Sequence, residues 1–405
     1  MSLIVPFQAS RPVADKVSLV SCRNYDDYSP AELTAWLNFN PYTFLHVLHP
    51  AYAFSHKIGI EKRFKGVAHK YADFKEDGIF CKESVPAFYL YEIQRKSKVF
   101  TGLVAGISID EYRQGNIKKH EDTLAYRVDI LKEYLNQTQF NAEPVLITYP
   151  EIPAIDQLWN QLKYTVPLYQ FSTTNKEFHR IWAVTDPTII ESIQAHFESL
   201  SALYIADGHH RMASSEKYWA DQESAHAAPP FCMGFLIEDH HVDIFEFNRL
   251  IRDLNGHSID SLIEALEKHF VVKPKDQDIW KPQSKYEFGL YANNQAYALY
   301  YKHHQHHTND PLSSLDAQIL YQTVLEPLLG IKDLRNDDRI EYMPGIESLN
   351  TLKELVDDGE YKLALLLYPA TIEEIKAIAD AGQIMPPKST YIEPKFRNGL
   401  LIHEF

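Results

Sequence analysis

Cysteine is scarce in this chain of 405 residues, which has three, at positions 22, 81 and 232, far from one another. An odd number of isolated cysteines forms no disulfide framework and offers no closely spaced pair for zinc. Disulfide-rich domains belong to oxidising environments, whereas the cytosol keeps thiols reduced. The cysteine content therefore favours a reducing compartment, and we expect the protein to be cytoplasmic.

Long hydrophobic runs are missing too. A membrane-spanning helix needs about 20 consecutive, mostly apolar residues, and no stretch of the sequence approaches that length. Residues 1–7 lack the basic start and the long apolar region of a signal peptide. We therefore expect no signal peptide and no membrane partner.

Positive charge is in deficit. Lysine and arginine number 40 against 55 aspartates and glutamates, so the formal net charge is −15. Proteins that bind nucleic acids broadly depend on clustered lysine and arginine to neutralise phosphates. The charge balance therefore disfavours a nucleic-acid partner, while it leaves room for a small basic pocket.

What is present is an ordinary globular composition, with 45% hydrophobic and 23% charged residues. The length exceeds the size at which one core stops growing, so we expect two domains. An N-terminal domain over 1–250 would carry the functional site and a C-terminal α+β domain would cover 251–384. For the tail over 385–405, a return to that site is one option.

Strand and helix patterns alternate irregularly, which predicts an α+β (mixed α/β) fold. Ser29, Pro30 and Glu32 form a strong helix-start signal, and Thr371 followed by two glutamates forms another. Apolar spacing predicts a helix over 58–74. Strands are predicted over the following ranges: 17–22, 44–48, 87–94, 100–109, 145–149 and 231–237.

The most informative stretch is 202–211, which predicts a buried strand, a turn and a helix start. Gly208 permits a turn that a side chain would block. Free backbone N–H groups and the helix dipole favour phosphate at such a start, and Arg211 adds a planar cationic fork. Asp207 can hold Mg²⁺ or accept a proton from a hydroxyl. The predicted phosphate-binding residues are Gly208, His209, His210 and Arg211.

A structural alternative for this stretch is a capped helix with solvated histidines. Five successive residues that donate, accept or carry charge, directly after a buried strand, favour a functional site instead. A zinc site is disfavoured, because adjacent helical residues point about 100° apart. His209 and His210 therefore do not easily reach one metal ion, and neither zincin spacing nor a cysteine pair is present.

The second candidate stretch is 118–127. Glu121 lies just ahead of a helix start predicted near residues 122–123, where a carboxylate is stabilised in its charged form. Such a carboxylate near a substrate hydroxyl can act as a general base. Taken alone, however, Glu121 is better explained as a helix-capping acid. The candidate substrate-binding residues of this stretch are His120, Thr123 and Arg127.

The tail and a histidine cluster are further candidates. Prolines 386 and 387 forbid helix and set an extended path. Lys388 and Thr390 would then contact a nucleotide or phosphate; equally, the segment is a final strand that joins the two domains. The histidines at 303, 304, 306 and 307 favour a polar hairpin loop over a metal site.

Four motifs together resemble a widespread prokaryotic family known chiefly as a domain of unknown function. They are Asp-Gly-His-His-Arg at 207–211, Ile-Lys-Lys-His-Glu at 117–121, the stretch 179–187 and the tail 385–391. The resemblance runs from about residue 3 to the C-terminus. It implies membership of this family but no particular activity.

The Asp-Gly-His-His-Arg motif also resembles the nucleotide-binding motif of the ParB/sulfiredoxin-like superfamily, in which free-serine kinases carry a very similar motif and use a glutamate as base. The resemblance implies that Gly208 to Arg211 hold phosphates and that Asp207 contacts the acceptor hydroxyl or Mg²⁺. Glu121 matches the kinase glutamate by role only. His209 stands where sulfiredoxin has its nucleophilic cysteine, so sulfiredoxin chemistry is not expected.

We therefore predict phosphoryl transfer, dependent on Mg²⁺ and on ATP or ADP, to a small hydroxylated metabolite such as serine. Such catalysis consists mostly of positioning and charge stabilisation. The predicted catalytic residues are Glu121, Asp207, His210 and Arg211. A non-catalytic nucleotide sensor using the same pocket is an alternative, and a ParB-like nucleic-acid-binding regulator is a second. The sequence leaves open the acceptor, the choice of nucleotide and whether the protein is a homodimer.

Overall fold

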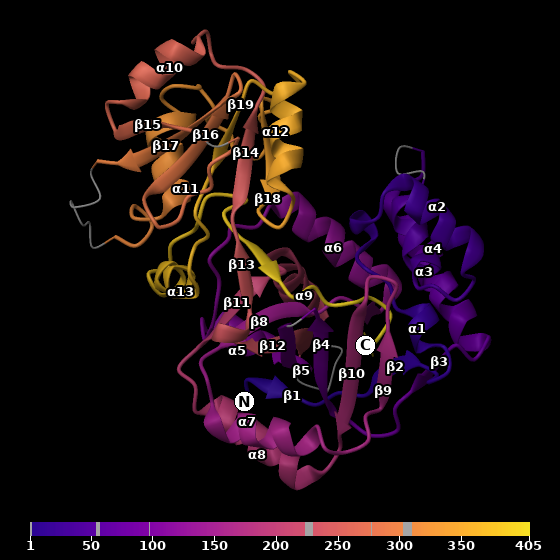
Figure 1. Cartoon of the computed structure of the whole chain (residues 1–405). Coiled ribbons are helices and arrows are strands. Elements are labelled where there is room, and N and C mark those ends of the chain that lie inside the picture. The colour runs from indigo at the N-terminus through magenta and orange to yellow at the C-terminus, as the bar shows by residue number, and fades with distance from the viewer. Residues whose placement is uncertain (1, 54–56, 97, 223–229, 277, 303–309) are drawn as a thin grey trace. The chain divides into compact units, whose positions relative to one another are not determined.

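The computed structural model describes residues 2–53, 57–96, 98–222, 230–276, 278–302 and 310–405. Helices and strands mix along the chain (Figure 1), so the predicted mixed α/β fold class is confirmed. The chain divides into two compact units. The first comprises Met1–Lys118, Thr123–Val242 and Pro394–Phe405, and the second comprises Lys119–Asp122 and Asp243–Glu393.

The first unit is built on a large sheet, to which the described residues contribute nine strands. They are β1 (Ile4–Val5), β4 (Phe88–Arg95), β5 (Lys98–Ser108), β6 (Ile117–Lys118), β8 (Val145–Tyr149), β9 (Tyr169–Ser172), β10 (Glu177–Val184), β11 (Leu203–Asp207) and β12 (Phe231–Glu238). The strand order is β6-β11-β8-β12-β5-β4-β10-β9, with β1 beside β5. The pairs β6–β11 and β8–β12 are parallel, and the other neighbours are antiparallel.

A smaller sheet of the same unit joins the two ends of the chain. Its strands are β2 (Ala9–Pro12), β3 (Phe80–Lys82), β7 (Phe140–Asn141) and β21 (Ile402–Glu404), in the order β3-β2-β21-β7. Because β21 lies between β2 and β7, the C-terminal residues are fixed against the N-terminal part of the unit.

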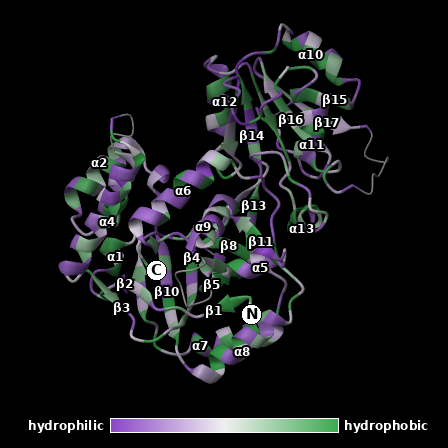
Figure 2. Cartoon of the chain, turned by 180° about the vertical axis from the view of Figure 1, so that it is seen from behind, coloured by the Kyte–Doolittle hydropathy of each residue, from purple (hydrophilic) through white to green (hydrophobic). Residues whose placement is uncertain are grey.

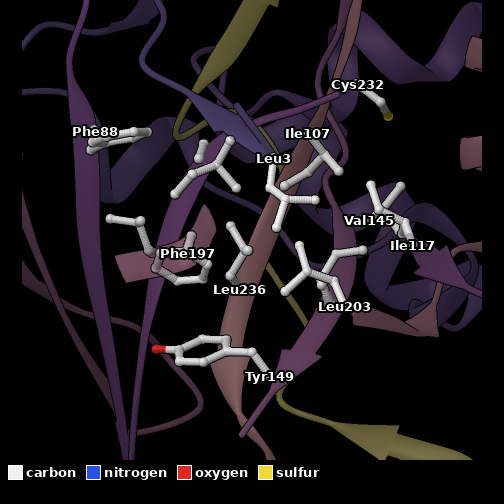
Figure 3. Close-up of a cluster of buried hydrophobic side chains, with 14 of the residues drawn as sticks. Leu3, Phe88, Ile107, Ile117, Val145, Tyr149, Phe197, Leu203, Cys232 and Leu236 are labelled. Atoms are coloured by element: carbon white, nitrogen blue, oxygen red, sulfur yellow. The ribbon is translucent and has the colours of Figure 1, made fainter. Parts of the chain in front are cut away.

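Two hydrophobic clusters support this unit. One lies at the large sheet, where Figure 3 shows Val145, Leu203 and Leu236 gathered with Tyr149. The helices around the sheet are α5 (Ile109–Arg113), α7 (Pro153–Leu162), α8 (Pro187–Glu198) and α9 (His209–Gln222). The second cluster lies among helices and the small sheet. These helices are α1 (Val17–Val20), α2 (Pro30–Phe39), α3 (Leu45–Tyr52), α4 (Ile60–Glu76) and α6 (Ala125–Thr138).

The hydropathy of the residues agrees with buried strands and partly exposed helices. Figure 2 shows hydrophobic residues along strands such as β1, whereas helices such as α4 and α8 carry hydrophilic and hydrophobic residues side by side. On α4, Phe64, Val67, Tyr71 and Phe74 are buried at spacings of three and four residues. This spacing places one apolar face toward the core and leaves the charged face to water, as the sequence pattern over 58–74 predicts.

The second unit contains an antiparallel sheet of its own. Its order is β15 (Phe270–Lys275), β17 (Gln295–Tyr301), β16 (Glu287–Ala292), β19 (Leu363–Leu366), β14 (Phe247–Ile251) and β18 (Ile340–Pro344). A separate pair joins β13 (Asp243–Phe245) to β20 (Tyr391–Glu393). The helices are α10 (Ile259–Leu266), α11 (Asp316–Leu320), α12 (Leu349–Asp357) and α13 (Ile372–Asp380), with a π-helical turn, η3, over Tyr321–Leu325.

The helix starts predicted at Ser29 and Thr371 are confirmed, whereas the one predicted near residues 122–123 lies at Leu124, the residue before α6. The Ser29 side chain accepts a hydrogen bond from the Glu32 N–H, and Glu32 accepts one from the Ser29 N–H. Thr371 and Glu374 form the same reciprocal pair at α13. These signals are local, because the residues that make the cap lie within one turn of each other.

Two predicted strands are wrong. Residues 17–20 and 45–52 form the helices α1 and α3. In α1, the buried residues Val17 and Val20 are three positions apart, and in α3, Leu45 and Leu48 have the same spacing. Burial on one side of a helix against the second hydrophobic cluster therefore outweighs the weak strand pattern of these short segments.

The division between the units falls at Val242 and Asp243, whereas the sequence places the transition near 250. The reason is strand pairing, because β14 lies between β18 and β19 of the second unit. The tail divides as well: residues up to Glu393 belong to the second unit and residues from Pro394 to the first. The predicted cluster of histidines 303–307 lies outside the described residues.

In the described parts of the chain, every helix is too short or too polar to span a membrane. The cytoplasmic location stays a prediction.

Candidate functional site

The turn between β11 and α9 has a conformation that depends on glycine. Gly208 has a φ of +94°, and a Cβ at this position would lie 3.1 Å from Arg211 Nε and 3.3 Å from Val145 Cα. The Gly208 carbonyl accepts the N–H of Met212, so the helix begins directly after the turn. The missing side chain therefore lets the guanidinium of Arg211 lie close against the turn.

Asp207, the last residue of β11, meets two cations. Its Oδ2 accepts a hydrogen bond from Lys395 Nζ at 3.0 Å and lies 3.6 Å from Arg211 Nη2. Burial by itself would raise the pKa of the Asp207 carboxyl, but the charges of Lys395 and Arg211 hold that pKa well below its usual range. The side chain remains 40% exposed, so this charged group is open to solvent and to a ligand.

Arg211 is held from its other side by the segment that leads into β8. Its Nη1 donates to the Pro144 carbonyl at 2.6 Å and lies 3.8 Å from Glu143 Oε2. The guanidinium is therefore fixed in orientation by a carbonyl and two acids. A small polar pocket lies here, lined among others by Asn24, Glu143, Asp207, Arg211, Lys395 and Asn398.

His210 joins the start of α9 to the start of α6. Its Nε2 accepts a hydrogen bond from the Leu124 N–H at 3.0 Å. A neutral imidazole that accepts at Nε2 carries its proton on Nδ1. Ion pairs further along join Lys217 to Asp129 and Lys132 to Asp221. The two helices therefore run parallel, with their N-termini together, and the positive ends of both helix dipoles lie near His210.

A larger cavity of about 330 Å³ lies among α3, α4, α6 and α9. Its lining is mostly apolar and includes Tyr52, Phe64, Leu131 and Tyr134. Tyr52 also stacks on Tyr25, with ring centroids 4.0 Å apart and ring planes 6° apart. Glu143 and Arg211 line both this cavity and the polar pocket. One ligand with an apolar part and an anionic part therefore has room for the apolar part beside the cations.

Of the residues predicted from the sequence, the first unit contains those of the Asp-Gly-His-His-Arg motif, together with Thr123 and Arg127. His209 is buried and His210 is half-buried. Thr123 directly precedes Leu124, the residue that His210 contacts. Arg127 is exposed on α6, where its Nε donates to the Tyr126 hydroxyl.

The other predicted residues belong to the second unit. The carbonyl of the buried residue His120 accepts the Met385 N–H at 2.8 Å, and Glu121 adjoins it. Lys388 Nζ lies 5.0 Å from the centre of the Phe247 ring, and Thr390 is buried. The roles predicted for these residues stay predictions.

Two residues of the site were missed by the sequence analysis, Lys395 and Glu143. Lys395 follows Pro394 just as Lys388 follows Pro387, so local sequence does not distinguish the two lysines. The available signal was the option that the tail over 385–405 returns to the site. Its final segment, Pro394–Phe405, does belong to the first unit. Glu143 lies in an unremarkable loop and gives no local signal.

The charged residues around Asp207 show whether this carboxylate can bind the predicted Mg²⁺. A magnesium ion in proteins is bound by carboxylates and substrate phosphates and retains several waters. The nearest charged groups to Asp207 Oδ2 are a lysine and an arginine, which repel a divalent cation. Asp207 in this arrangement therefore does not fit a Mg²⁺ site.

Comparison with protein families gives one match: the model described as "Protein of unknown function (DUF1015)" covers residues 4–318. A search of curated proteins found no match.

Solved structures similar to this chain include a free serine kinase in complex with AMP, at 14% identity and a TM-score of 0.37, covering 74% of this chain and 91% of the other. Another is a free serine kinase mutant in complex with ADP, at 14% identity and a TM-score of 0.38, with coverages of 75% and 93%. A third is SbnI with a C-terminal truncation from Staphylococcus aureus, at 10% identity and a TM-score of 0.38, with coverages of 74% and 86%.

The substitution Gly208→Ala should destabilise the first unit more than Gly115→Ala. Both glycines have positive φ, which costs a residue with a side chain about 1–2 kcal/mol. A Cβ at Gly115 meets no atom within 4 Å, whereas one at Gly208 meets Arg211 and the backbone of Val145. Urea unfolding followed by tryptophan fluorescence measures the difference. Equal losses of unfolding free energy would show that the close approach at Gly208 is unimportant.

The substitution Asp207→Asn should lower stability at neutral pH, and this difference from the wild type should shrink in acid. Because the folded pKa of Asp207 is depressed, its contribution is complete above the unfolded pKa of about 3.9 and declines as pH falls below that value. Unfolding free energies of both proteins at intervals from pH 7 to pH 3 test this. A difference that is constant or grows toward pH 3 contradicts the ion-pair assignment.

Proposed function

The chain belongs to the DUF1015 family of proteins of unknown function, and we propose that it binds a nucleotide by its phosphates at the start of α9 and transfers a phosphoryl group to a small hydroxylated metabolite. The donor is ATP or ADP. The observation that carries the proposal is the meeting of Arg211 and Lys395 at Asp207, on the glycine turn that opens α9.

These groups suit a phosphate for three separate reasons. The first turn of a helix offers backbone N–H groups that have no partner within the helix. Arg211 supplies a planar fork that matches phosphate oxygens, and Lys395 supplies a compact point charge. The parallel start of α6 adds a second positive helix end beside His210. A phosphate at this place would meet donors from several directions.

Asp207 occupies the two cations that a phosphate would use. Its carboxylate is the shared anionic partner of both cations. An incoming phosphate carries more negative charge and competes for the same two side chains. Because the pKa of Asp207 is held low, this carboxylate is a weak proton acceptor. It is therefore better suited to orienting an acceptor hydroxyl than to deprotonating it.

The proposed phosphoryl transfer forms one bond to phosphorus and breaks another. The acceptor hydroxyl oxygen forms a bond to the terminal phosphorus while the bond to the bridging oxygen of the nucleotide breaks. Arg211 and Lys395 stabilise the negative charge that remains on the leaving phosphate. The hydroxyl proton passes to a carboxylate base, for which Glu121 is the candidate. A Mg²⁺ ion bound to the nucleotide phosphates, and not to Asp207, would supply further charge neutralisation.

The apolar cavity supports a nucleotide as the ligand. At about 330 Å³ it lies within the range of small-molecule sites, and aromatic rings such as Tyr52 and Tyr134 line it. Arg211 lines both the cavity and the polar pocket, so a base in the cavity would leave its phosphates near the turn. A free phosphate or a purely polar phosphosugar would not use this apolar surface.

A nucleotide sensor without catalysis is the second candidate. It is favoured by one observation: the groups proposed to bind the nucleotide belong to the first unit, whereas Glu121 belongs to the second. Binding would therefore require only the first unit, and the proton acceptor is the part that distinguishes the two functions.

The substitution Arg211→Ala should weaken ADP binding by about tenfold or more. Removing a charge-assisted hydrogen bond costs about 1.5–3 kcal/mol, and 1.4 kcal/mol corresponds to a factor of ten. Isothermal titration calorimetry measures the affinity. Arg113→Ala is the matched control, because Arg113 is a partly exposed arginine whose partners are Asp110 and Glu216. An unchanged affinity in Arg211→Ala means that the phosphate assignment is wrong.

The substitution Glu121→Gln should abolish phosphoryl transfer while nucleotide binding remains within about twofold of the wild type. The amide keeps the shape of the side chain but does not accept a proton. Turnover is measured as consumption of ATP or ADP with Mg²⁺ and a panel of hydroxylated metabolites, serine included. Wild-type protein that binds nucleotide but shows no turnover with any acceptor would favour the sensor.

A further inference from the structure

A group of potential metal ligands lies at the C-terminal end of β12, apart from the proposed phosphate site. Glu238 is the last residue of the strand, and a single 3-10 turn, η2 (Asp239–His241), follows it. The carboxylate of Glu238 and the rings of His240 and His241 offer one ligand atom each, and all three atoms lie within 4.8 Å of one another.

The geometry of these three side chains is close to that of a coordination shell. Glu238 Oε2 lies 3.5 Å from His240 Nε2 and 3.8 Å from His241 Nδ1. Zinc bonds of about 2.0–2.1 Å in a tetrahedron place ligand atoms about 3.3–3.4 Å apart. The two distances from Glu238 Oε2 therefore exceed the zinc value by a few tenths of an ångström, and rotamer adjustments of the two imidazoles would bring the three atoms to bonding distance from one ion.

One oxygen of the buried Glu238 carboxylate has no hydrogen-bond partner among the described residues. The Glu238 side chain is 2% exposed, and among the described residues Oε2 receives no hydrogen bond. Oε1 accepts a long one, at 3.5 Å, from the Ile152 N–H. A buried carboxylate oxygen without a partner is costly, and buried charges are normally paired or coordinate a metal. The unpartnered oxygen points toward the two imidazoles.

We propose that Glu238, His240 and His241 bind a divalent transition-metal ion of the zinc type. Imidazole nitrogen with one carboxylate oxygen is a donor set suited to zinc, whereas calcium and magnesium favour oxygen ligands alone. His240 is 54% and His241 36% exposed, so the site opens to solvent on the imidazole side. Three protein ligands leave a fourth position for water or for an atom of a ligand.

The Glu238 carboxylate has an acidic neighbour. Asp156, on α7, faces Glu238, so two carboxyl groups lie side by side here. A metal ion would offset the mutual repulsion of the two carboxylates. Asp156 would then act as the outer partner that ligating groups commonly have.

This site is separate from the start of α9. β12 is parallel to β8, whereas β11 is antiparallel to β8, so β11 and β12 end at opposite edges of the sheet. Phe235, which lines the polar pocket, lies three residues before Glu238, about 10 Å along the strand. Because successive side chains of a strand alternate between the two faces of the sheet, Phe235 and Glu238 also lie on opposite faces. The metal proposal therefore stands or falls independently of the proposed phosphoryl transfer.

The test is calorimetric titration of the full chain with ZnCl₂ in the absence of nucleotide. Removing a zinc ligand should weaken binding at this site by more than about tenfold, since loss of even an outer partner costs 10–100-fold. The half-exposed His240 makes His240→Ala the primary variant, because it leaves the buried core intact. Glu238→Gln is the second variant, and its fold is checked by circular dichroism.

The control variant replaces histidines 303, 304, 306 and 307 by alanine, because this sequence cluster is an alternative source of zinc binding. The proposal predicts that a zinc-binding event persists in the control and is lost in His240→Ala. It is overturned if His240→Ala binds zinc as the wild type does, or if the control variant binds no zinc.

Discussion

The organisation of the candidate site depends on one carboxylate, that of Asp207, held between Lys395 and Arg211. The three residues come from the end of β11, from the first turn of α9 and from the C-terminal segment. Gly208 allows the turn that brings Arg211 back over its own strand. The pairing of β21 between β2 and β7 fixes the C-terminal segment in the same unit that contains β11. The arrangement is therefore a consequence of the fold as a whole.

Such partly exposed ion pairs contribute little to stability, commonly less than about 1 kcal/mol each. Their physical effect here is orientation. Pro144 and Glu143 hold the guanidinium from one side while Asp207 holds it from the other. Two cations are thereby kept close together in a chain whose net charge is −15. A ligand phosphate would replace Asp207 as their partner without a large rearrangement, which is the condition for electrostatic preorganisation.

How far the sequence predicts this molecule depends on how local each feature is. The strand, turn and helix at 202–211 follow from residues adjacent in the chain, as do the caps at Ser29 and Thr371. The parts that depend on distant residues were not predicted: Lys395 reaches Asp207 across 188 positions, and the cavity draws on four helices. The same limit explains α1 and α3, whose burial against the second cluster overrides a local strand pattern. The sequence over residues 238–241 is typical of a polar turn, and it does not show that the Glu238 carboxylate is buried.

The central claim is that the start of α9 recognises phosphate, and the most direct measurement compares ADP with adenosine as ligands of the wild-type protein by calorimetry. Both carry the base that would occupy the apolar cavity, and they differ in the phosphates that would meet Arg211 and Lys395. ADP should bind at least about tenfold more tightly than adenosine, as expected for one or more charge-assisted hydrogen bonds. Equal affinities for the two ligands would contradict a phosphate site at this turn.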